Sequence, residues 1–318
     1  MIPTCERPAL LSRVLEALAA QTMPADELEI IVCDDAGSDE TRALVDEWRD
    51  AHPGSVITYL RGRRPRMGPA AMRNAGWRAA RGKVIAFTDD DTVPELDWVH
   101  QGVLALEAEA ADAASGRIVV PVPDEPTDYE RDTARLEGAG FVTANCFCLR
   151  SVLESVGGFD PRFRTAWRED SDLFFKLIKG GFEIVYAIDA VVMHPVRTAP
   201  WGVSLRAESK HVYDARLYKK HPELYARFIR PDRPYLYYAI LASLSVAVAG
   251  LAVDSTRLTT WSSAVWLALT VMLVARRLRS TSRRPSHVAE VVATSLVVPF
   301  LSVYHRVRGG IAFRVAFW

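Results

Sequence analysis

Short apolar runs and helical repeats of apolar residues follow one another along the first part of the chain. The runs Leu28–Cys33, Val56–Leu60 and Val84–Thr88 have the length of buried strands. Apolar residues at helical spacing follow Pro8, Ser38 and Pro69, which are residue types common at helix starts. Strands that alternate with helices of this length predict an α/β fold with a doubly wound, mostly parallel sheet.

The chain beyond residue 115 is less regular. Strand-like segments at Arg117–Val122 and Phe141–Leu149 are separated by a longer polar stretch. We therefore expect one domain over residues 1–230, with a regular half at about 1–115 and a less regular half at about 116–230.

Long apolar segments occupy the region 231–318, which we expect to associate with a membrane. Tyr235–Val253 is 19 residues without a charge, and as a helix it spans about 28 Å, close to the thickness of a bilayer core. With the shorter run Trp261–Ala275 it predicts a helical hairpin over 235–275. A third stretch, 288–304, contains Glu290 and Pro299. We expect it to be an interfacial helix or a third membrane helix.

The zero net charge of the chain hides two halves of opposite sign. Residues 1–200 hold 22 Lys+Arg and 33 Asp+Glu, a balance of −11, whereas 201–318 hold 17 and 6, a balance of +11. An acidic half with a carboxylate cluster excludes a nucleic-acid surface, and a basic half with apolar runs predicts contact with membrane lipids.

Arginines flank the predicted hairpin on both sides and indicate its orientation. They are Arg227, Arg230 and Arg233 before it and Arg276, Arg277, Arg279, Arg283 and Arg284 after it. Because positively charged flanks stay in the cytoplasm, we expect the protein at the cytoplasmic membrane with its catalytic domain on the cytoplasmic side.

Several common kinds of site are missing from the sequence. It contains no glycine-rich P-loop and no GxGxxG, so a nucleotide must be held in another way. Its four cysteines form no CxxC pair and lack a histidine at zinc spacing. We expect these cysteines to be buried and reduced.

Three consecutive aspartates, Asp89, Asp90 and Asp91, end the apolar run Val84–Thr88. Ligands of open α/β sheets collect at the carboxyl ends of the strands. Carboxylates without a nearby Cys or His favour a hard cation, Mg²⁺ or Mn²⁺, whose shell is usually completed by substrate phosphates. The pattern predicts a metal site for a phosphate ester, and its alternative is a polar loop after a strand.

Several further segments resemble family-2 glycosyltransferases of the GT-A fold, over residues 1 to about 200. They are Ile2-Pro3-Thr4 with Arg7-Pro8, Val32 to Asp39, Gly68 to Gly76, Phe87 to Asp91, Gly157 to Asp160 and Arg168 to Leu173. The chain departs from the family pattern in having Ala36 between Asp35 and Gly37 and in lacking most of the first strand. Met1–Thr4 looks like the end of that strand, so we expect the natural start to lie further upstream.

The resemblance implies that the domain over residues 1–230 is catalytic, with a nucleotide half at about 1–115 and an acceptor half at about 116–230. It also implies roles for residues on the donor side. Asp35 would accept a hydrogen bond from the imide N–H of a pyrimidine, which favours a UDP-type or dTDP-type donor, and Thr4, Arg7 and Arg73 would lie beside the nucleotide. Asp89 and Asp91 would bind the metal with His194, and Asp90 would face the ribose or the sugar. The alternatives are that Asp34-Asp35 caps a turn, that Arg73 is a solvated charge and that His194 is structural.

On the other side of the donor, the resemblance implies that Asp170 is the catalytic base. Asn145, Trp167 and Glu169 would lie toward the acceptor. The alternatives are that Glu169 complements a helix dipole and that Asn145 and Trp167 belong to the core or a turn.

These roles predict a metal-dependent, inverting glycosyltransferase. It would move a sugar from a nucleotide-diphosphate donor to a hydroxyl of a lipid-linked or cell-envelope glycan acceptor at the cytoplasmic membrane face. Two alternatives remain open: an aspartyl-phosphate phosphohydrolase with Asp89 as nucleophile, since Asp89–Val93 fits a DxDxV pattern, and a catalytically silent nucleotide-binding membrane scaffold.

Overall fold

The computed structural model describes residues 1–64, 66–229 and 234–317. The chain forms two compact units. The first consists of Met1–Pro121 and Ala134–Arg197, and the second of Val122–Thr133 and Thr198–Trp318. The chain therefore visits the second unit twice. The expected functional division at residue 230 stays a prediction.

The first unit begins with three parallel strands, as predicted. β1 (Ile2–Thr4), β2 (Glu29–Asp34) and β3 (Val56–Arg61) pair in the order β1-β2-β3. The helices between and after them are α1 (Pro8–Ala19), α2 (Asp39–Ala51) and α3 (Pro69–Ala79). All three helices begin within one residue of the predicted starts.

The remaining strands of this unit form a mixed sheet in the order β4-β7-β6-β8-β5. They are β4 (Val84–Thr88), β5 (Val93–Pro94), β6 (Ala113–Val119), β7 (Asn145–Leu149) and β8 (Ile184–Met193). β6 and β8 are parallel, whereas β7 runs antiparallel to both of its neighbours. Met1 donates from its amino group to Ala86 O (2.9 Å) and accepts from Thr88 N (3.2 Å), so β1 adjoins β4 and the two sheets meet.

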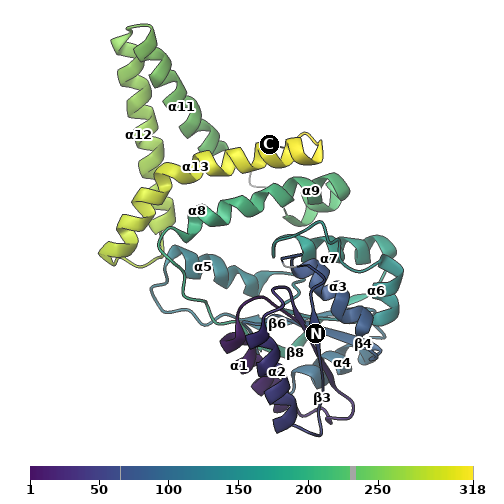
Figure 1. The fold of residues 1–318 in the computed structure, drawn as a ribbon. Helices are drawn as coiled ribbons and strands as arrows, with labels where there is room; N and C mark the ends of the chain where they lie inside the picture. Colours follow the sequence, from purple (N-terminus) through teal and green to yellow (C-terminus); the bar gives the residue numbers. More distant parts are fainter. Residues whose placement is uncertain (65, 230–233, 318) are drawn as a thin grey trace. The chain divides into compact units, whose positions relative to one another are not determined.

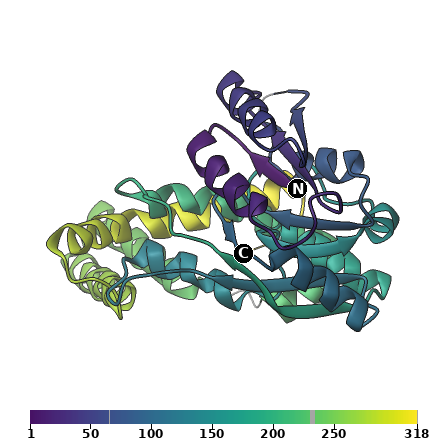
Figure 2. The ribbon, with the colours of Figure 1, turned by 90° about the horizontal axis from the view of Figure 1, so that it is seen from below.

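Helices cover both faces of β2 in the three-stranded sheet, as a doubly wound fold requires. Ile30 and Val32 of β2 pack in one core cluster with α1, α2 and α4 (Trp98–Ala108), and Figure 2 shows α1 and α2 side by side. Ile31 and Cys33 point the other way and pack with α3, α6 (Arg150–Val156) and α7 (Glu169–Gly180), which lie together in Figure 1. Two-sided burial explains why Ile30 to Cys33 of β2 are apolar without alternation.

The second unit is helical in its described part. Its elements are α5 (Asp128–Ala134, whose last residue belongs to the first unit), α8 (Val203–Ala207), the 3₁₀ turn η2 (Glu208–His211), α9 (Val212–Lys220), α10 (Pro222–Leu224), the π turn η3 (Tyr225–Ile229), α11 (Tyr235–Ala252), α12 (Thr256–Leu278) and α13 (Pro285–Phe313). A further 3₁₀ turn, η1 (Arg135–Gly138), follows α5. Arg230 and Arg233, two of the arginines expected to flank the hairpin, lie outside the described residues.

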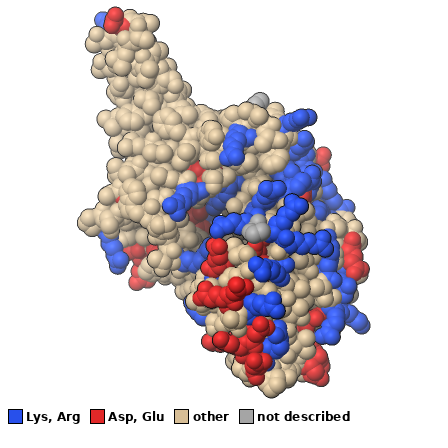
Figure 3. All heavy atoms as spheres, viewed as in Figure 1, with Lys and Arg blue, Asp and Glu red and all other residues tan. Residues whose placement is uncertain are grey.

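Among the described residues, three helices are long and apolar enough to cross a membrane: α11, α12 and α13, with mean hydropathies of 1.7, 1.6 and 1.5. α11 and α12 form the predicted hairpin with a short link, and the third predicted stretch lies within α13, which continues through Pro299. Figure 3 shows a hairpin surface almost free of charge except at its tip, where Asp254 and Arg257 lie.

Candidate active site

The aspartate triplet follows β4 at its carboxyl end, where the first unit gathers most of its buried charges. Asp90 is only 2% exposed and accepts hydrogen bonds from Thr4 Oγ1 (2.8 Å) and Arg7 Nη1 (2.9 Å). Burial raises the pKa of Asp90, although Arg7 and Thr4 oppose the shift. The structure thus brings three predicted donor-side residues together, with Thr4 and Arg7 fixing the Asp90 carboxylate.

Arg73 of α3 connects Asp89 to the start of α7. Its guanidinium donates to Asp89 Oδ1 (2.6 Å) and to Glu169 Oε1 (2.9 Å), and the residue is 1% exposed. Burial alone would lower the pKa of Arg73, but the charges of Asp89 and Glu169 more than offset it, so the guanidinium stays protonated. Arg73 is therefore not the solvated charge of the alternative interpretation.

The start of α7 places two adjacent carboxylates beside this arginine. Glu169 is buried, and its Oε2 has no hydrogen-bond partner in the part of the chain that the structure describes. Burial and the neighbouring charge of Asp170 raise the pKa of Glu169 to about 7, although Arg73 opposes the shift. Asp170 is half-buried and accepts from Ser171 N (2.6 Å) and Ser171 Oγ (3.2 Å).

Burial also raises the pKa of Asp170, against the hydrogen bonds from Ser171 and the charges of Arg168 and Arg73. Arg168, the residue before α7, has a φ of 74°, a left-handed conformation that non-glycine residues rarely adopt and that often marks a functional site. Together, Glu169 and Asp170 make a pair of carboxylates that binds and releases a proton nearer neutral pH than solvated carboxylates do.

Asp91 points toward the end of β8. Arg197 Nε lies 2.9 Å from Asp91 Oδ2, and His194 Nε2 lies 3.7 Å from Asp91 Oδ1. His194 is 8% exposed, and its Nδ1 has no partner among the described residues. The histidine predicted to bind metal thus lies beside one of the two predicted metal carboxylates.

These residues fit a hard cation that takes few protein ligands. Within the described ranges, no three His, Cys, Asp or Glu side chains converge as in a closed metal cage. Mg²⁺ and similar ions are commonly held by one or two carboxylates, with waters and substrate phosphates completing the shell. Asp89 and Asp91 supply such carboxylates, since Arg73 and Arg197 each contact only one oxygen of them, whereas Thr4 and Arg7 hold both oxygens of Asp90.

The two aspartates after β2 have different surroundings. Asp34 is fully buried and accepts from Ala36 N (2.9 Å), Ser38 N (2.7 Å) and Tyr59 Oη (2.9 Å), so it holds the turn before α2. Asp35 accepts from Met67 N (2.7 Å) and Gly68 N (2.8 Å). Each oxygen of Asp35 keeps a second lone pair, and its predicted contact with a nucleobase stays a prediction.

The predicted acceptor-side residues lie in different surroundings. Asn145 is fully buried, donates to Arg117 O (2.9 Å) and Ala190 O (2.8 Å), and accepts from Trp98 Nε1 (2.8 Å), so it holds β6, β7 and β8 together. Trp167 is half-buried, with the Arg168 guanidinium 4.4 Å from its ring centroid. Their acceptor contacts stay predictions, and Trp167 is the one with exposed surface to offer.

A sequence model described as glycosyl transferase family 2 matches residues 1–168, which is more than half of the chain and includes the aspartate triplet. The chain belongs to this family. The predicted enzyme class is therefore confirmed: the protein is a glycosyltransferase whose donors are sugar nucleotides.

Curated relatives support the assignment. Glycosyltransferase AglE of Haloferax volcanii is 24% identical over 217 residues, which cover 65% of this chain and 69% of AglE. Validoxylamine A glucosyltransferase of Streptomyces hygroscopicus is 26% identical over 271 residues, covering 70% of this chain and 61% of that enzyme. The chain thus spans about two thirds of the length of these relatives.

Solved structures confirm the GT-A fold. The mannosyltransferase PcManGT from Pyrobaculum calidifontis, in complex with GDP-Man and Mn²⁺, aligns with a TM-score of 0.57 at 20% identity, covering 98% of this chain and 85% of its own. S. aureus TarS 1-349 in complex with UDP aligns with a TM-score of 0.53 at 16% identity, covering 97% and 90%.

Two features of this family 2 glycosyltransferase site were not predicted from the sequence. One is Arg197, whose only signal is its position shortly after His194. The other is the ion pair between Arg73, which was expected beside the nucleotide, and Glu169, which was expected beside the acceptor. The two residues are far apart in sequence, and no local pattern reports such a pair.

Proposed function

We propose that this glycosyltransferase is metal-dependent and inverting. It transfers a sugar from a nucleotide-diphosphate donor to a hydroxyl of a lipid-linked or cell-envelope glycan acceptor at the cytoplasmic face of the membrane. The observation that supports this most directly is the Asp89–Arg73–Glu169 connection. It holds the aspartate triplet, in which Asp89 and Asp91 form a DxD segment, and the Glu169–Asp170 pair on either side of one guanidinium.

Each carboxylate in the proposed site has a distinct task. Asp89 and Asp91, with His194, would hold Mg²⁺ or Mn²⁺. A bound cation supplies positive charge against the departing nucleoside diphosphate. Asp90, fixed by Thr4 and Arg7, faces the ribose or the sugar.

Asp170 is the proposed base. The attacking hydroxyl must lose its proton as the new bond forms, and a carboxylate with a raised pKa is suited to accept it. A base on the side opposite to the leaving group gives inversion at the sugar carbon. Trp167, next to the same helix, offers partly exposed aromatic surface for the acceptor.

For the donor, we propose a UDP-type or dTDP-type sugar nucleotide, read by Asp35. The solved relatives bind different nucleotides, since TarS holds UDP and PcManGT holds GDP-Man. The carboxylate of Asp35 is fixed by Met67 N and Gly68 N, and a fixed acceptor suits the imide N–H of a pyrimidine.

The membrane location rests on the helical unit. α11 and α12 have the length and composition of membrane spans, and the arginines that follow α12 favour a cytoplasmic position for its end. An acceptor presented at this membrane face, such as a lipid-linked sugar or an envelope glycan, suits an enzyme anchored there.

The test uses the detergent-purified full chain with a panel of nucleotide sugars and a membrane extract as acceptor source. We expect nucleoside diphosphate release with a pyrimidine donor in Mn²⁺ or Mg²⁺, loss of release with EDTA, and recovery when metal is restored. The Asp91→Asn variant should require a higher metal concentration than the wild type to reach its half-maximal rate. The control Asp189→Asn, at an exposed position, should require the same concentration as the wild type.

Two results would contradict the proposal. Donor binding without release across the whole panel would indicate the silent scaffold, and equal rates with and without EDTA would refute metal dependence. The phosphohydrolase alternative has lost its support, because the chain belongs to a glycosyltransferase family.

A further inference from the structure

The last long helix, α13, carries an exposed apolar stripe along its length. We call Val292, Leu296, Phe300, Tyr304, Val307 and Ile311 the α13 stripe; each is between 40% and 74% exposed. These positions recur every three or four residues, so they lie on one face of the helix. Much of this face is therefore open in the described part of the chain.

The opposite face of α13 is buried and more polar. Its buried residues are His287, Val291, Thr294, Ser295, Val298, Pro299, Ser302 and Gly309. A helix that crosses a bilayer among lipids is apolar on its lipid-facing sides, whereas a helix that lies at an interface has one apolar face and one polar face. α13 has an exposed apolar face, and the polar side chains His287, Thr294, Ser295 and Ser302 lie on its buried face beside apolar residues.

The polar face of α13 packs on α8, η2 and α9 from one end to the other. Gly202 N, just before α8, donates to Glu290 Oε1 (2.6 Å), and Lys219 Nζ of α9 donates to Phe313 O (2.7 Å). Between these points the helices approach closely, since a Cβ on Gly309 would lie 2.6 Å from Val212 O.

The helices beneath α13 are too charged to enter hydrocarbon. Between residues 203 and 220 they carry Arg206, Glu208, Lys210, Asp214, Arg216, Lys219 and Lys220. Charged side chains at the centre of a bilayer are strongly disfavoured. Because α13 keeps its contacts with this segment along its whole length, it cannot cross the membrane without breaking them.

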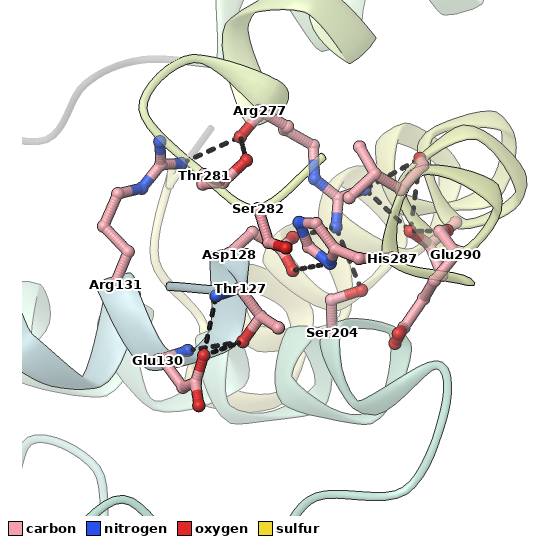
Figure 4. Close-up of polar contacts among 12 residues, drawn as sticks. Thr127, Asp128, Glu130, Arg131, Ser204, Arg277, Thr281, Ser282, His287 and Glu290 are labelled. Atoms are coloured by element: carbon pink, nitrogen blue, oxygen red, sulfur yellow. Dashed lines mark hydrogen bonds and ion pairs between the residues drawn. The ribbon is translucent and has the colours of Figure 1, made fainter. Parts of the chain in front are cut away.

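A polar cluster fixes which face of α13 points outward (Figure 4). Arg277, near the end of α12, donates to Thr294 Oγ1 (2.8 Å) and Ser295 Oγ (3.0 Å) of α13 and pairs with Asp128 of α5. The same guanidinium donates to Ser204 Oγ of α8 (3.2 Å). These contacts set the rotation of α13 about its axis and leave the stripe on the outside.

We propose that the α13 stripe lies in the plane of the membrane interface, at the boundary between headgroups and acyl chains of an anionic bilayer. This proposal rests on the proposed membrane location and decides between the two predicted states of the third apolar stretch. We assign the bilayer as the partner of the α13 stripe because α13 adjoins the proposed membrane hairpin. It packs against both α11 and α12 and runs across the base of their hairpin (Figure 1).

Charge complementarity supports the same partner. Arg279, Arg283, Arg284, Arg308 and Arg314, in and around α13, are all exposed. Arginines near an anionic surface attract a protein to the membrane. The exposed arginines and the apolar stripe together match the two chemical layers of an interface.

The experiment measures the depth of single cysteines in the full chain. Cys5 is replaced by serine, and the buried Cys33, Cys146 and Cys148 are left in place. Val292→Cys, Phe300→Cys and Ile311→Cys each receive an environment-sensitive fluorophore in phosphatidylcholine–phosphatidylglycerol vesicles that carry a nitroxide either near the headgroup or deep in the chains.

We expect all three labels to be quenched more by the shallow nitroxide than by the deep one, and to equal depths. A spanning α13 would instead separate positions 292 and 311 by roughly 28 Å along the bilayer normal, with position 300 deepest. A gradient of that kind overturns the proposal. The proposal is also overturned if none of the three labels is quenched, or if the label at position 300 is deep while those at positions 292 and 311 are shallow.

Labelling with a membrane-impermeant maleimide provides an independent readout. Val292→Cys and Ile311→Cys should react from the same side as Leu104→Cys, an exposed position on α4, and reaction from opposite sides overturns the proposal. Thr256→Cys, at the hairpin tip, should react from the other side. If Thr256→Cys reacts from the same side as Leu104→Cys, the hairpin does not span the membrane and that part of the proposed function is wrong. The quenching experiment still tests the position of α13 independently.

Discussion

Arg73 is buried between carboxylates from two distant segments. Because it contacts both, it determines how these segments are positioned in the site. Taking a guanidinium out of water costs several kcal/mol unless its N–H groups are paired. Here the Nη atoms reach Asp89 and Glu169, while the Phe159 ring centroid lies 5.8 Å from the guanidinium carbon. Once buried, Arg73 fixes the distance between the DxD segment and the proposed base.

Replacing the proposed base tests its role without changing its shape. Asp170→Asn keeps the volume of the side chain and its bond from Ser171 but cannot take a proton at neutral pH. We expect kcat to fall about 10²–10⁴-fold, with the Kd for the donor unchanged. Steady-state rates and donor titration measure both, and Asp189→Asn serves as the control. Unchanged turnover in Asp170→Asn would rule out the assignment.

The pH dependence of the rate follows from the raised pKa of the Glu169–Asp170 pair. The base must be unprotonated, so kcat/KM should fall at acid pH, on a limb that burial of Asp170 moves above the range of a solvated aspartate. Glu169→Gln removes one of two like charges, which lowers the pKa of the remaining carboxylate. The acid limb of the profile should then move to lower pH.

Glutamine keeps the oxygen that accepts from Arg73, so this variant isolates charge from shape. A pH–rate profile measured on both proteins checks the shift, with thermal unfolding as the control for folding. An acid limb at the same pH in both proteins would mean that another group sets it.

At the scale of elements, the turn between β3 and α3 positions the proposed nucleobase acceptor. Gly68 has a φ of +93°, and its N–H donates to Asp35 Oδ2. A Cβ at this position would lie 2.5 Å from the backbone oxygen of Arg164. Both the conformation and the close approach therefore require glycine.

Gly68→Ala should lower the free energy of unfolding by about 1–3 kcal/mol and weaken donor binding, because the turn must shift away from Asp35. Gly54→Ala is the matched control, since no atom lies within 4 Å of its added Cβ and its backbone is not left-handed. Chemical denaturation and donor titration measure the two effects. Equal stability of the two variants would show that the turn accommodates the methyl group.

The sequence predicted those elements whose local signals agree with their packing. Helices after Pro8, Ser38 and Pro69 were predicted because their starts and their apolar spacing point the same way. The insertion of β7 between β4 and β6 was not predicted, since strand order depends on pairing between distant segments. The site shows the same limit: the aspartates were predicted from their place after a strand, whereas Arg197 and the Arg73–Glu169 pair depend on the folded chain.

At the scale of the whole molecule, charge and hydropathy divide along the chain as the proposed location requires. The acidic first 200 residues contain the carboxylates of the site, and the basic remainder contains the apolar helices. The hairpin offers a direct test of the membrane location, because the proposal places the exposed apolar residues of α12 against lipid.

Leu267 lies in the middle of α12 with 57% of its surface exposed. If α12 crosses the bilayer, Leu267→Arg places a charge in hydrocarbon, at a cost of about 2.5–3.5 kcal/mol on insertion scales. We expect the wild-type chain to resist extraction by alkaline carbonate and the variant to be largely released or degraded. Leu104→Arg on α4, 47% exposed in the first unit, is the control and should be retained like the wild type. Equal retention of both variants would show that α12 does not lie in the bilayer core, because an unsolvated arginine there must weaken insertion.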